Sequence, residues 1–197
     1  MRRRTFDVLM VVAGLGVAVV LAVAGVLLTW GHAVVADQVH SQLAAQKIYF
    51  PAVSNPEFKA LPAANADAMR PFAGQLMTTG AQAKAYADHF IAVHLKGIGG
   101  GQTYSQLATK AMTQPNNTKL AEEVQVIFRG TSLRSMLLEA YGFWQIGQIA
   151  WIGAIVAYAA AGLLLLLSAF GLAHLRRVPE AAEVFPRVSH SVKVQTA

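Results

Sequence analysis

The chain of 197 residues contains no cysteine, which excludes internal disulfides and thiolate metal sites. Charge is also scarce, because Asp, Glu, Lys and Arg make up 13% of the residues, against about a quarter in average soluble domains. Two long segments, Val8–Leu28 and Ile146–Ala173, contain no charged residue at all. The low content of charged residues therefore comes from these two segments. The region between them has no disulfide and must be held together by packing.

The two charge-free segments are strongly apolar, and each exceeds the roughly 20 residues that cross about 30 Å of hydrocarbon as a helix. Helices in soluble cores do not need such a length without a charge. The sequence therefore predicts an all-α membrane protein, in which two transmembrane helices flank an extracytoplasmic helical bundle. Its predicted parts are a cytoplasmic N-terminus (1–7), the first transmembrane helix (8–30), the helical domain (31–142), the second transmembrane helix (143–175) and a disordered cytoplasmic tail (176–197).

The formal net charge of +6 is concentrated at the ends of the apolar segments. Arg2, Arg3 and Arg4 precede the first segment, and Arg176 and Arg177 follow the second. The positive-inside rule then places both termini in the cytoplasm of a bacterial cell, with the central domain outside the plasma membrane. Residues 31–142 carry nine Lys or Arg against seven Asp or Glu, without a basic stripe. We therefore expect the lipid bilayer as a partner and no nucleic acid.

A cleaved signal peptide is a competing interpretation of the N-terminal segment. The three arginines resemble the start of such a peptide, and residues 34–36 could form a cleavage site. Its apolar run is about 21 residues long, however, whereas the corresponding region of a signal peptide has about 7–15. We therefore expect a retained span.

Small residues recur in both predicted spans at the spacing of one helical face. Such faces allow helices to approach closely in lipid. They predict an antiparallel pairing of the two spans or binding to another protein's helices, although spans rich in Ala and Gly also produce such stripes by chance. The small-residue faces consist of Gly14, Ala18, Ala22 and Gly25, and of Ala150, Ala154, Ala157 and Ala161. The residues expected at the membrane interface are Trp30, Trp144, Trp151, Arg176 and Arg177.

The central region has the periodicity of several helices joined by turns. The pattern predicts a helix over residues 33–48, an irregular connection over 49–70 that could be a binding loop, and a second helix from Pro71 to Gly97. Thr103 is expected to cap a short helix that ends at Met112. After a turn at residues 114–117 the helical pattern returns, and Gly130 is expected to interrupt it before the second span.

Few residues suggest catalysis or metal binding. Asp37 and His40 lie three residues apart and could share a metal with a third ligand, whereas His89 and His94 would diverge on one helix. The serines form no nucleophile elbow, so we expect no catalytic residue and no cofactor. Arg129 and Arg134, just outside the second span, could bind lipid headgroups or pair with carboxylates of the domain.

Four groups of residues carry a resemblance to a known family: Tyr49–Pro51, Gly80–Asp88, Thr103–Ser105, and Phe128–Gly130 with Leu133–Arg134 and Leu137–Leu138. Through them the chain resembles an uncharacterised family of bacterial two-span membrane proteins, over most of its length from the first span to the second. Members are sometimes labelled aromatic ring-opening dioxygenases, but such an enzyme needs an iron site, for which this sequence offers no convincing ligands. The resemblance therefore implies the topology and no catalytic residue.

Three classes of function remain open. The leading interpretation is a non-catalytic accessory or scaffold subunit, which binds other membrane-protein subunits or further copies of itself through the outer domain and the small-residue faces. The alternative is a module that senses a small ligand or lipid, in a pocket lined by Tyr49, Phe50, Phe90 and Tyr104. The third is an envelope enzyme, for which Asp37 and His40 would be the first metal ligands to test.

Overall fold

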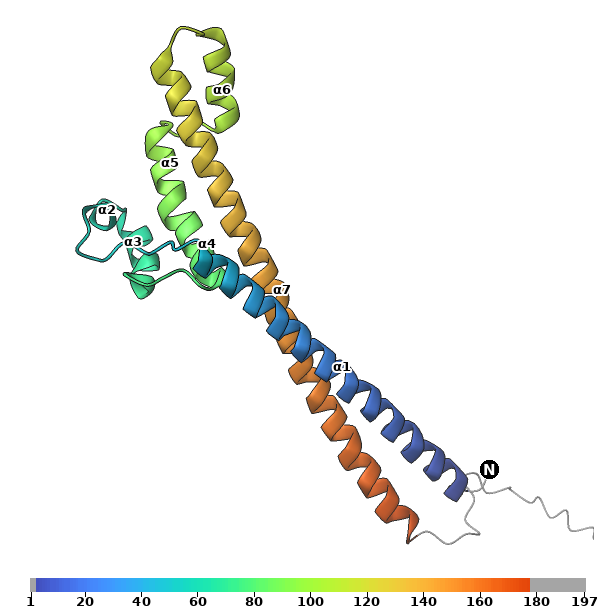
Figure 1. Cartoon of the computed structure of the whole chain (residues 1–197). Helices are drawn as coiled ribbons and strands as arrows, with labels where there is room; N and C mark the ends of the chain where they lie inside the picture. Colours follow the sequence, from blue (N-terminus) through green and yellow to red (C-terminus); the bar gives the residue numbers. More distant parts are fainter. Residues whose placement is uncertain (1–2, 178–197) are drawn as a thin grey trace, which may run out of the picture. The chain divides into compact units, whose positions relative to one another are not determined.

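The structure is a computed structural model that describes residues 3–177 and is all-α in that range. Two long helices, near the two ends of the range, are joined by a series of short ones (Figure 1). The predicted tail beyond Arg177 and the first two residues lie outside the described residues. The elements are α1 (Arg3–Ala45), α2 (Pro56–Lys59), α3 (Ala63–Met69), the 3₁₀ turn η1 (Arg70–Phe72), α4 (Gly80–Tyr86), the π-helical turn η2 (Ala87–Ile91), α5 (Ala92–Ile98), α6 (Tyr104–Thr113) and α7 (Thr118–Leu175).

The two long helices, α1 and α7, are each long and apolar enough to span a membrane. They pack together and run in opposite directions, because residues early in α1 lie against residues late in α7. Gly14, for example, faces Ser168, whereas Gly25 faces Tyr158. The chain divides into two compact units, and both helices contribute to each of them.

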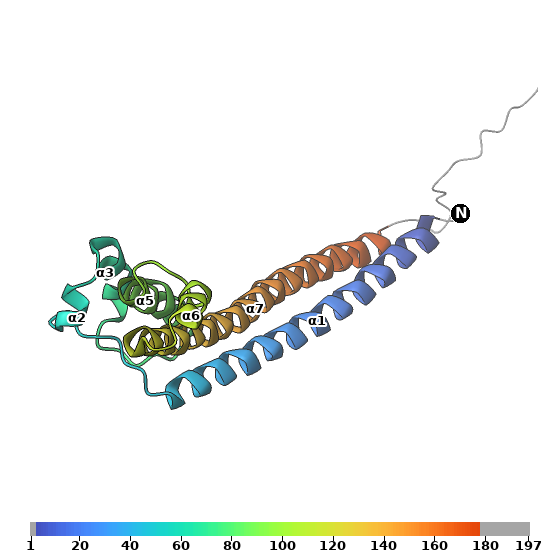
Figure 2. The same cartoon turned by 90° about the horizontal axis from the view of Figure 1, so that it is seen from above.

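The first unit, within the described range, contains residues 3–29, which belong to α1, and residues 152–177, of which 152–175 belong to α7. The two segments lie side by side in both views (Figures 1 and 2). Small residues occupy most of the buried positions, and the large apolar side chains point outward, as Val20 does with 67% of its surface exposed. The buried residues here are Val11, Ala18 and Gly25 on α1, and Ala154, Ala157, Ala161 and Ser168 on α7.

The second unit, residues 30–151, has two hydrophobic clusters. The larger joins Val39 and Leu43 of α1 to Leu137 of α7, with the short helices packed around them. The smaller lies where α6 folds back along the start of α7, and it consists of Leu107, Leu120, Val124 and Ile127 (Figure 1).

The connection over residues 49–70 is more regular than predicted, since it forms α2 and α3. The prolines begin helices here instead of interrupting them: Pro56 is the first residue of α2, after the capping residue Asn55, and Pro62 precedes α3. Phe58 and Met69 anchor these helices in the larger cluster. The prediction of an irregular loop is therefore wrong for most of this segment.

The predicted helix from Pro71 begins instead at Gly80, and Pro71 lies in η1. Thr79 caps α4, because its hydroxyl accepts the backbone N–H of Gln82 while the Gln82 side chain accepts that of Thr79. The residues before Thr79 pair with the segment after α1, through Phe50 N–H to Gln75 O at 2.9 Å and Met77 N–H to Ile48 O at 2.9 Å. This pairing keeps the segment extended.

The predicted interruption of the last helix at Gly130 is wrong, because α7 continues through it. A Cβ atom at Gly130 would collide with the side chain of Leu95, so this glycine provides space for α5. The prediction for Thr103 is confirmed, since it caps α6 and shares reciprocal hydrogen bonds with Gln106.

Candidate functional site

A groove of about 370 Å³ lies between residues 35–46, which form the end of α1 and the start of the turn after it, and residues 136–143 of α7. Its base is apolar, with Val39 and Leu43 buried. Its rim exposes two large apolar side chains of α7, with Met136 62% and Phe143 55% exposed. Removing these apolar side chains from water is favourable, so the groove offers an apolar surface to a partner.

The α1 wall of this groove carries a row of amides. Gln38 and Gln42 are four residues apart, which places them on one face of α1, and Gln46 follows in the turn after the helix. Glu139 adds one negative charge from α7, and among residues 3–177 it forms no ion pair. Since amides both donate and accept hydrogen bonds, the groove can bind a surface that is apolar at its centre and polar at its edge.

Close packing of α1 and α7 limits the groove at one end. Gly147 is buried, and a Cβ atom built there would lie 3.2 Å from Val35 Cγ1. The Nδ1 atom of His32 lies 2.9 Å from the Gly147 carbonyl oxygen, and it must donate because a carbonyl only accepts. The His32 ring also packs on Trp151, with 5.4 Å between ring centroids. These contacts hold the two walls in a defined position.

The π-helical turn η2 is joined to α7 through charged groups. Asp88 Oδ2 lies 2.6 Å from Lys84 Nζ, and Asp88 Oδ1 lies 2.7 Å from Arg134 Nη2. Arg134 Nε also donates to the Ala87 carbonyl oxygen at 3.2 Å, which accepts the backbone N–H of Ala92 as well. Of the two partners considered for Arg134, the structure shows the carboxylate.

These contacts set the protonation of Asp88 and Lys84. Burial alone would raise the pKa of Asp88, but the hydrogen bonds and positive charges of Lys84 and Arg134 outweigh it and hold that pKa below its usual value. The hydrogen bond to Asp88 raises the pKa of Lys84 in turn. Both groups are thus held in their charged forms, and they tie α4 and η2 to α7.

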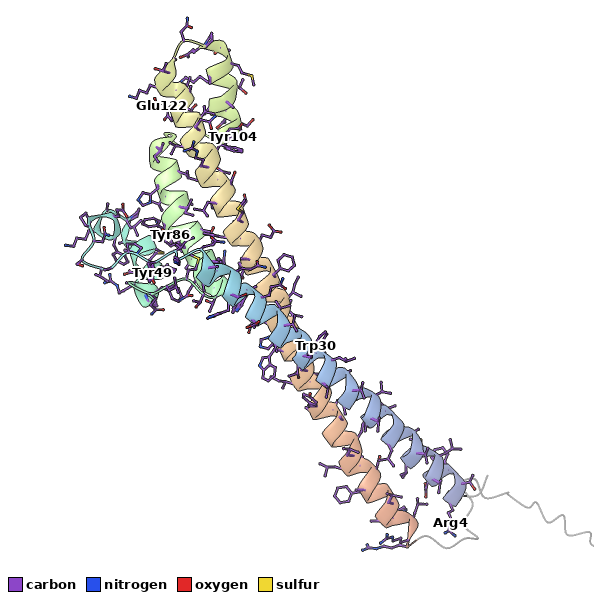
Figure 3. The ribbon with its side chains drawn as sticks, in the orientation of Figure 1. Arg4, Trp30, Tyr49, Tyr86, Tyr104 and Glu122 are labelled. Atoms are coloured by element: carbon purple, nitrogen blue, oxygen red, sulfur yellow. The ribbon has the colours of Figure 1, made fainter. Side chains whose placement is uncertain are left out.

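The pocket expected from Tyr49, Phe50, Phe90 and Tyr104 does not form. Phe50 and Phe90 both contact Tyr86, at 5.3 and 4.8 Å between ring centroids, and burial raises the pKa of Tyr86, with a smaller contribution from the charge of Glu57. Tyr49, however, is 61% exposed. Tyr104 packs on Phe128 at the end of the unit distant from Tyr49 and Tyr86 (Figure 3). The four aromatic residues therefore do not line one pocket: Phe50 and Phe90 pack around Tyr86, and Tyr104 packs on Phe128.

The residues considered for a metal site are not brought together with a third ligand. Asp37 and His40 are both exposed on α1, and the described part of the chain contains no group of three His, Cys, Asp or Glu that could hold an ion. His89 and His94 make other contacts: Nδ1 of His89 lies 2.9 Å from Asn65 Oδ1, and Nδ1 of His94 lies 2.7 Å from the Phe90 carbonyl oxygen.

The remaining residues singled out from the sequence lie in both units. A Cβ atom at Gly14 would lie 2.8 Å from Ser168 Oγ, and one at Gly25 would lie 2.6 Å from the Tyr158 ring. Ala22 and Ala150 are half-buried beside the buried alanines of their helices. Of the proposed interface residues, Trp144 is half-buried against Gly80, and the exposed ones are Trp30, Trp151, Arg176 and Arg177.

Sequence reasoning missed the groove, although its signal was present. Glutamines at positions 38, 42 and 46 repeat at the helical spacing, and Met136 and Phe143 lie seven residues apart on a second helix. Only the pairing of the two helices shows that these patterns face the same groove. No protein-family model, curated protein or solved structure matches this chain, so the groove is interpreted from its own geometry.

Proposed function

We propose that this protein is a two-span membrane protein and a non-catalytic scaffold subunit, which holds a helix of another membrane-protein subunit in the groove between α1 and α7. In this proposal both termini are cytoplasmic and the helical domain, residues 31–142, lies outside a bacterial plasma membrane. The arginines that flank the apolar segments support this orientation.

The observation that carries the proposal is the exposed apolar rim of the groove. Met136 and Phe143 lie on one face of α7 together with Ala140, at the rim of a groove whose base is apolar. Two adjacent helices form the walls, and an amphipathic third helix is the element that fills such a groove. Methionine adapts its shape to different partners, which suits a docking surface.

A membrane-protein partner is favoured because the wall helices are the same two helices that carry the apolar segments. The small residues first considered for partner binding are covered within the chain, since Ala18, Ala154 and Ala161 are buried between α1 and α7. The proposal therefore assigns binding to the groove and not to the small-residue faces.

Site-specific photocrosslinking in native membranes tests this proposal. A photoreactive amino acid replaces Met136 or Phe143 in the groove, and Met112 serves as the control because it is 82% exposed on α6, outside the groove. We expect one discrete crosslinked product of constant mass from both groove positions and none from Met112. Absence of a product at the groove positions, together with a monodisperse monomer after extraction, would contradict the proposal.

A further inference from the structure

A second hollow, of about 420 Å³, lies between η2 and α5 on one side and α7 on the other. Its walls are apolar and consist of Phe90, Ile91, Leu95, Val126 and Leu133. Gly130 forms part of it, because the missing side chain allows Leu95 to lie directly against α7. The hollow is separate from the α1–α7 groove, with which it shares no lining residue.

The wall begins at a π-helical turn, which is rare and often found at functional sites. The extra residue in this turn rotates the following side chains by roughly 100° relative to a regular helix. The ion pair from Asp88 to Arg134 holds the turn against α7, and the one from Asp88 to Lys84 joins it to α4. The irregular turn is thus fixed in place.

Arg129 brings one positive charge to the hollow. Arg129 lines it, and within residues 3–177 the guanidinium of Arg129 makes no hydrogen bond or ion pair. No carboxylate lines the hollow. The other titratable group there, His94, uses Nδ1 to bond the Phe90 carbonyl oxygen.

We propose that this hollow binds the carboxylate of a medium-chain fatty acid, with the carboxylate on Arg129 and the acyl chain along the apolar walls. A guanidinium matches a carboxylate through two parallel hydrogen bonds, and one cation balances one negative charge. The α7 side of the hollow, from residue 126 to residue 133, is about 10 Å long at 1.5 Å per residue. This length favours a short acyl chain over a long one.

Equilibrium dialysis of radiolabelled octanoate against the full chain in phosphatidylcholine nanodiscs tests the proposal, with empty nanodiscs as the blank. We expect one saturable site. Butyrate, which keeps the carboxylate and lacks most of the chain, is expected to bind more weakly than octanoate by about tenfold or more, as is octyltrimethylammonium, which keeps the chain and reverses the charge.

Arg129→Gln is expected to weaken octanoate binding by about tenfold or more, because it removes the charge-assisted hydrogen bonds. Lys119→Gln is the matched control, since it removes an exposed cation from the same helix outside the hollow. An unchanged melting temperature for Arg129→Gln shows that the fold is intact. Octanoate uptake no greater than that of empty nanodiscs, equal binding of butyrate, or equal binding by Arg129→Gln would each overturn the proposal.

Discussion

Two glycines of α7 stand in opposite environments. A Cβ atom at Gly130 would collide with Leu95, whereas one at Gly142 would meet no atom within 4 Å. Both positions are inside a helix, where glycine is less favourable than alanine. Gly130 therefore provides room for a neighbour, and Gly142 only adds flexibility to the unfolded chain.

The matched substitutions Gly130→Ala and Gly142→Ala should consequently change stability in opposite directions. We expect Gly130→Ala to lower the free energy of unfolding by about 1–3 kcal/mol, the usual cost of overpacking. Gly142→Ala should raise it by about 0.5–1 kcal/mol through helix propensity. Thermal unfolding of the two variants in the same detergent measures both. Equal effects would contradict the assigned role of Gly130.

Asp88 makes a pH-dependent contribution to stability. Its pKa is lowered in the folded chain from an ordinary value of 3.8, so its stabilisation is present above about pH 4 and is lost as the pH falls through the lowered pKa. We expect Asp88→Asn to cost about 1 kcal/mol at pH 7 and less at pH 3. Denaturant unfolding at both pH values measures the difference.

Asp67→Asn is the control for this experiment. Asp67 pairs with Arg70 at 3.2 Å, but both side chains are well exposed and their interaction is screened by water. Its substitution should leave the stability at pH 7 nearly unchanged. A loss for Asp67→Asn as large as that for Asp88→Asn would show that the acidic dependence does not come from the ion pairs at η2.

The partners of Asp88 show why this part of the molecule could not be predicted from the sequence. Arg134 lies 46 residues away along the chain, and Asp88 lies in a π-helical turn that no local pattern indicates. The capping role of Thr103 was predictable, since it depends only on Gln106 three residues later. Local chemistry was therefore visible in the sequence, and pairings across the fold were not.

At the scale of helices, the contact within the first unit depends on small side chains. The buried positions of α7 there follow alternating steps of three and four residues, from Ala154 through Ala157 to Ala161. This spacing is typical of two helices that wrap gently around each other. Ala18, which is fully buried, occupies the facing seam of α1, and a larger side chain there must separate the helices.

Because the chain has no cysteine, an introduced pair can report this contact. Gly14→Cys with Ser168→Cys should form a disulfide on oxidation, since a Cβ atom at Gly14 lies 2.8 Å from Ser168 Oγ. Adding Ala18→Leu should slow its formation by about tenfold, in line with an overpacking cost of 1–3 kcal/mol. Adding Val20→Leu, at an exposed position, should leave the rate of disulfide formation unchanged. Equal rates of disulfide formation with Ala18→Leu and with Val20→Leu would show that Ala18 lies outside the contact between α1 and α7.

The boundaries of the short helices were predicted less well than the long helices. Proline and glycine were treated as breakers at residues 56, 62 and 130, yet Pro56 starts a helix and Gly130 lies inside one. The meaning of each residue depends on its neighbours in space: Gly130 accommodates Leu95, and the segment before Gly80 is drawn into pairing with residues 48–50. A long apolar segment, in contrast, can be recognised from the sequence alone, without knowing which residues it contacts.

For the whole molecule, the long apolar helices and the flanking arginines support the proposal of two membrane spans that flank a helical domain, whose docking groove lies on the outer side of the plasma membrane. The helical class and the two long apolar helices were predictable, because both follow from composition and periodicity. The groove was not, because it arises from the pairing of α1 with α7 over residues 35–46 and 136–143.

The most direct test of this account is the accessibility of single introduced cysteines to a membrane-impermeant maleimide in spheroplasts. Lys119→Cys lies in the proposed outer domain, and Arg177→Cys follows the second apolar segment; both positions are exposed. The account predicts that residue 119 is labelled in intact spheroplasts and residue 177 only after the membrane is permeabilised. Labelling in the reverse order, equal labelling of both residues, or recovery of the chain in the soluble fraction would contradict it.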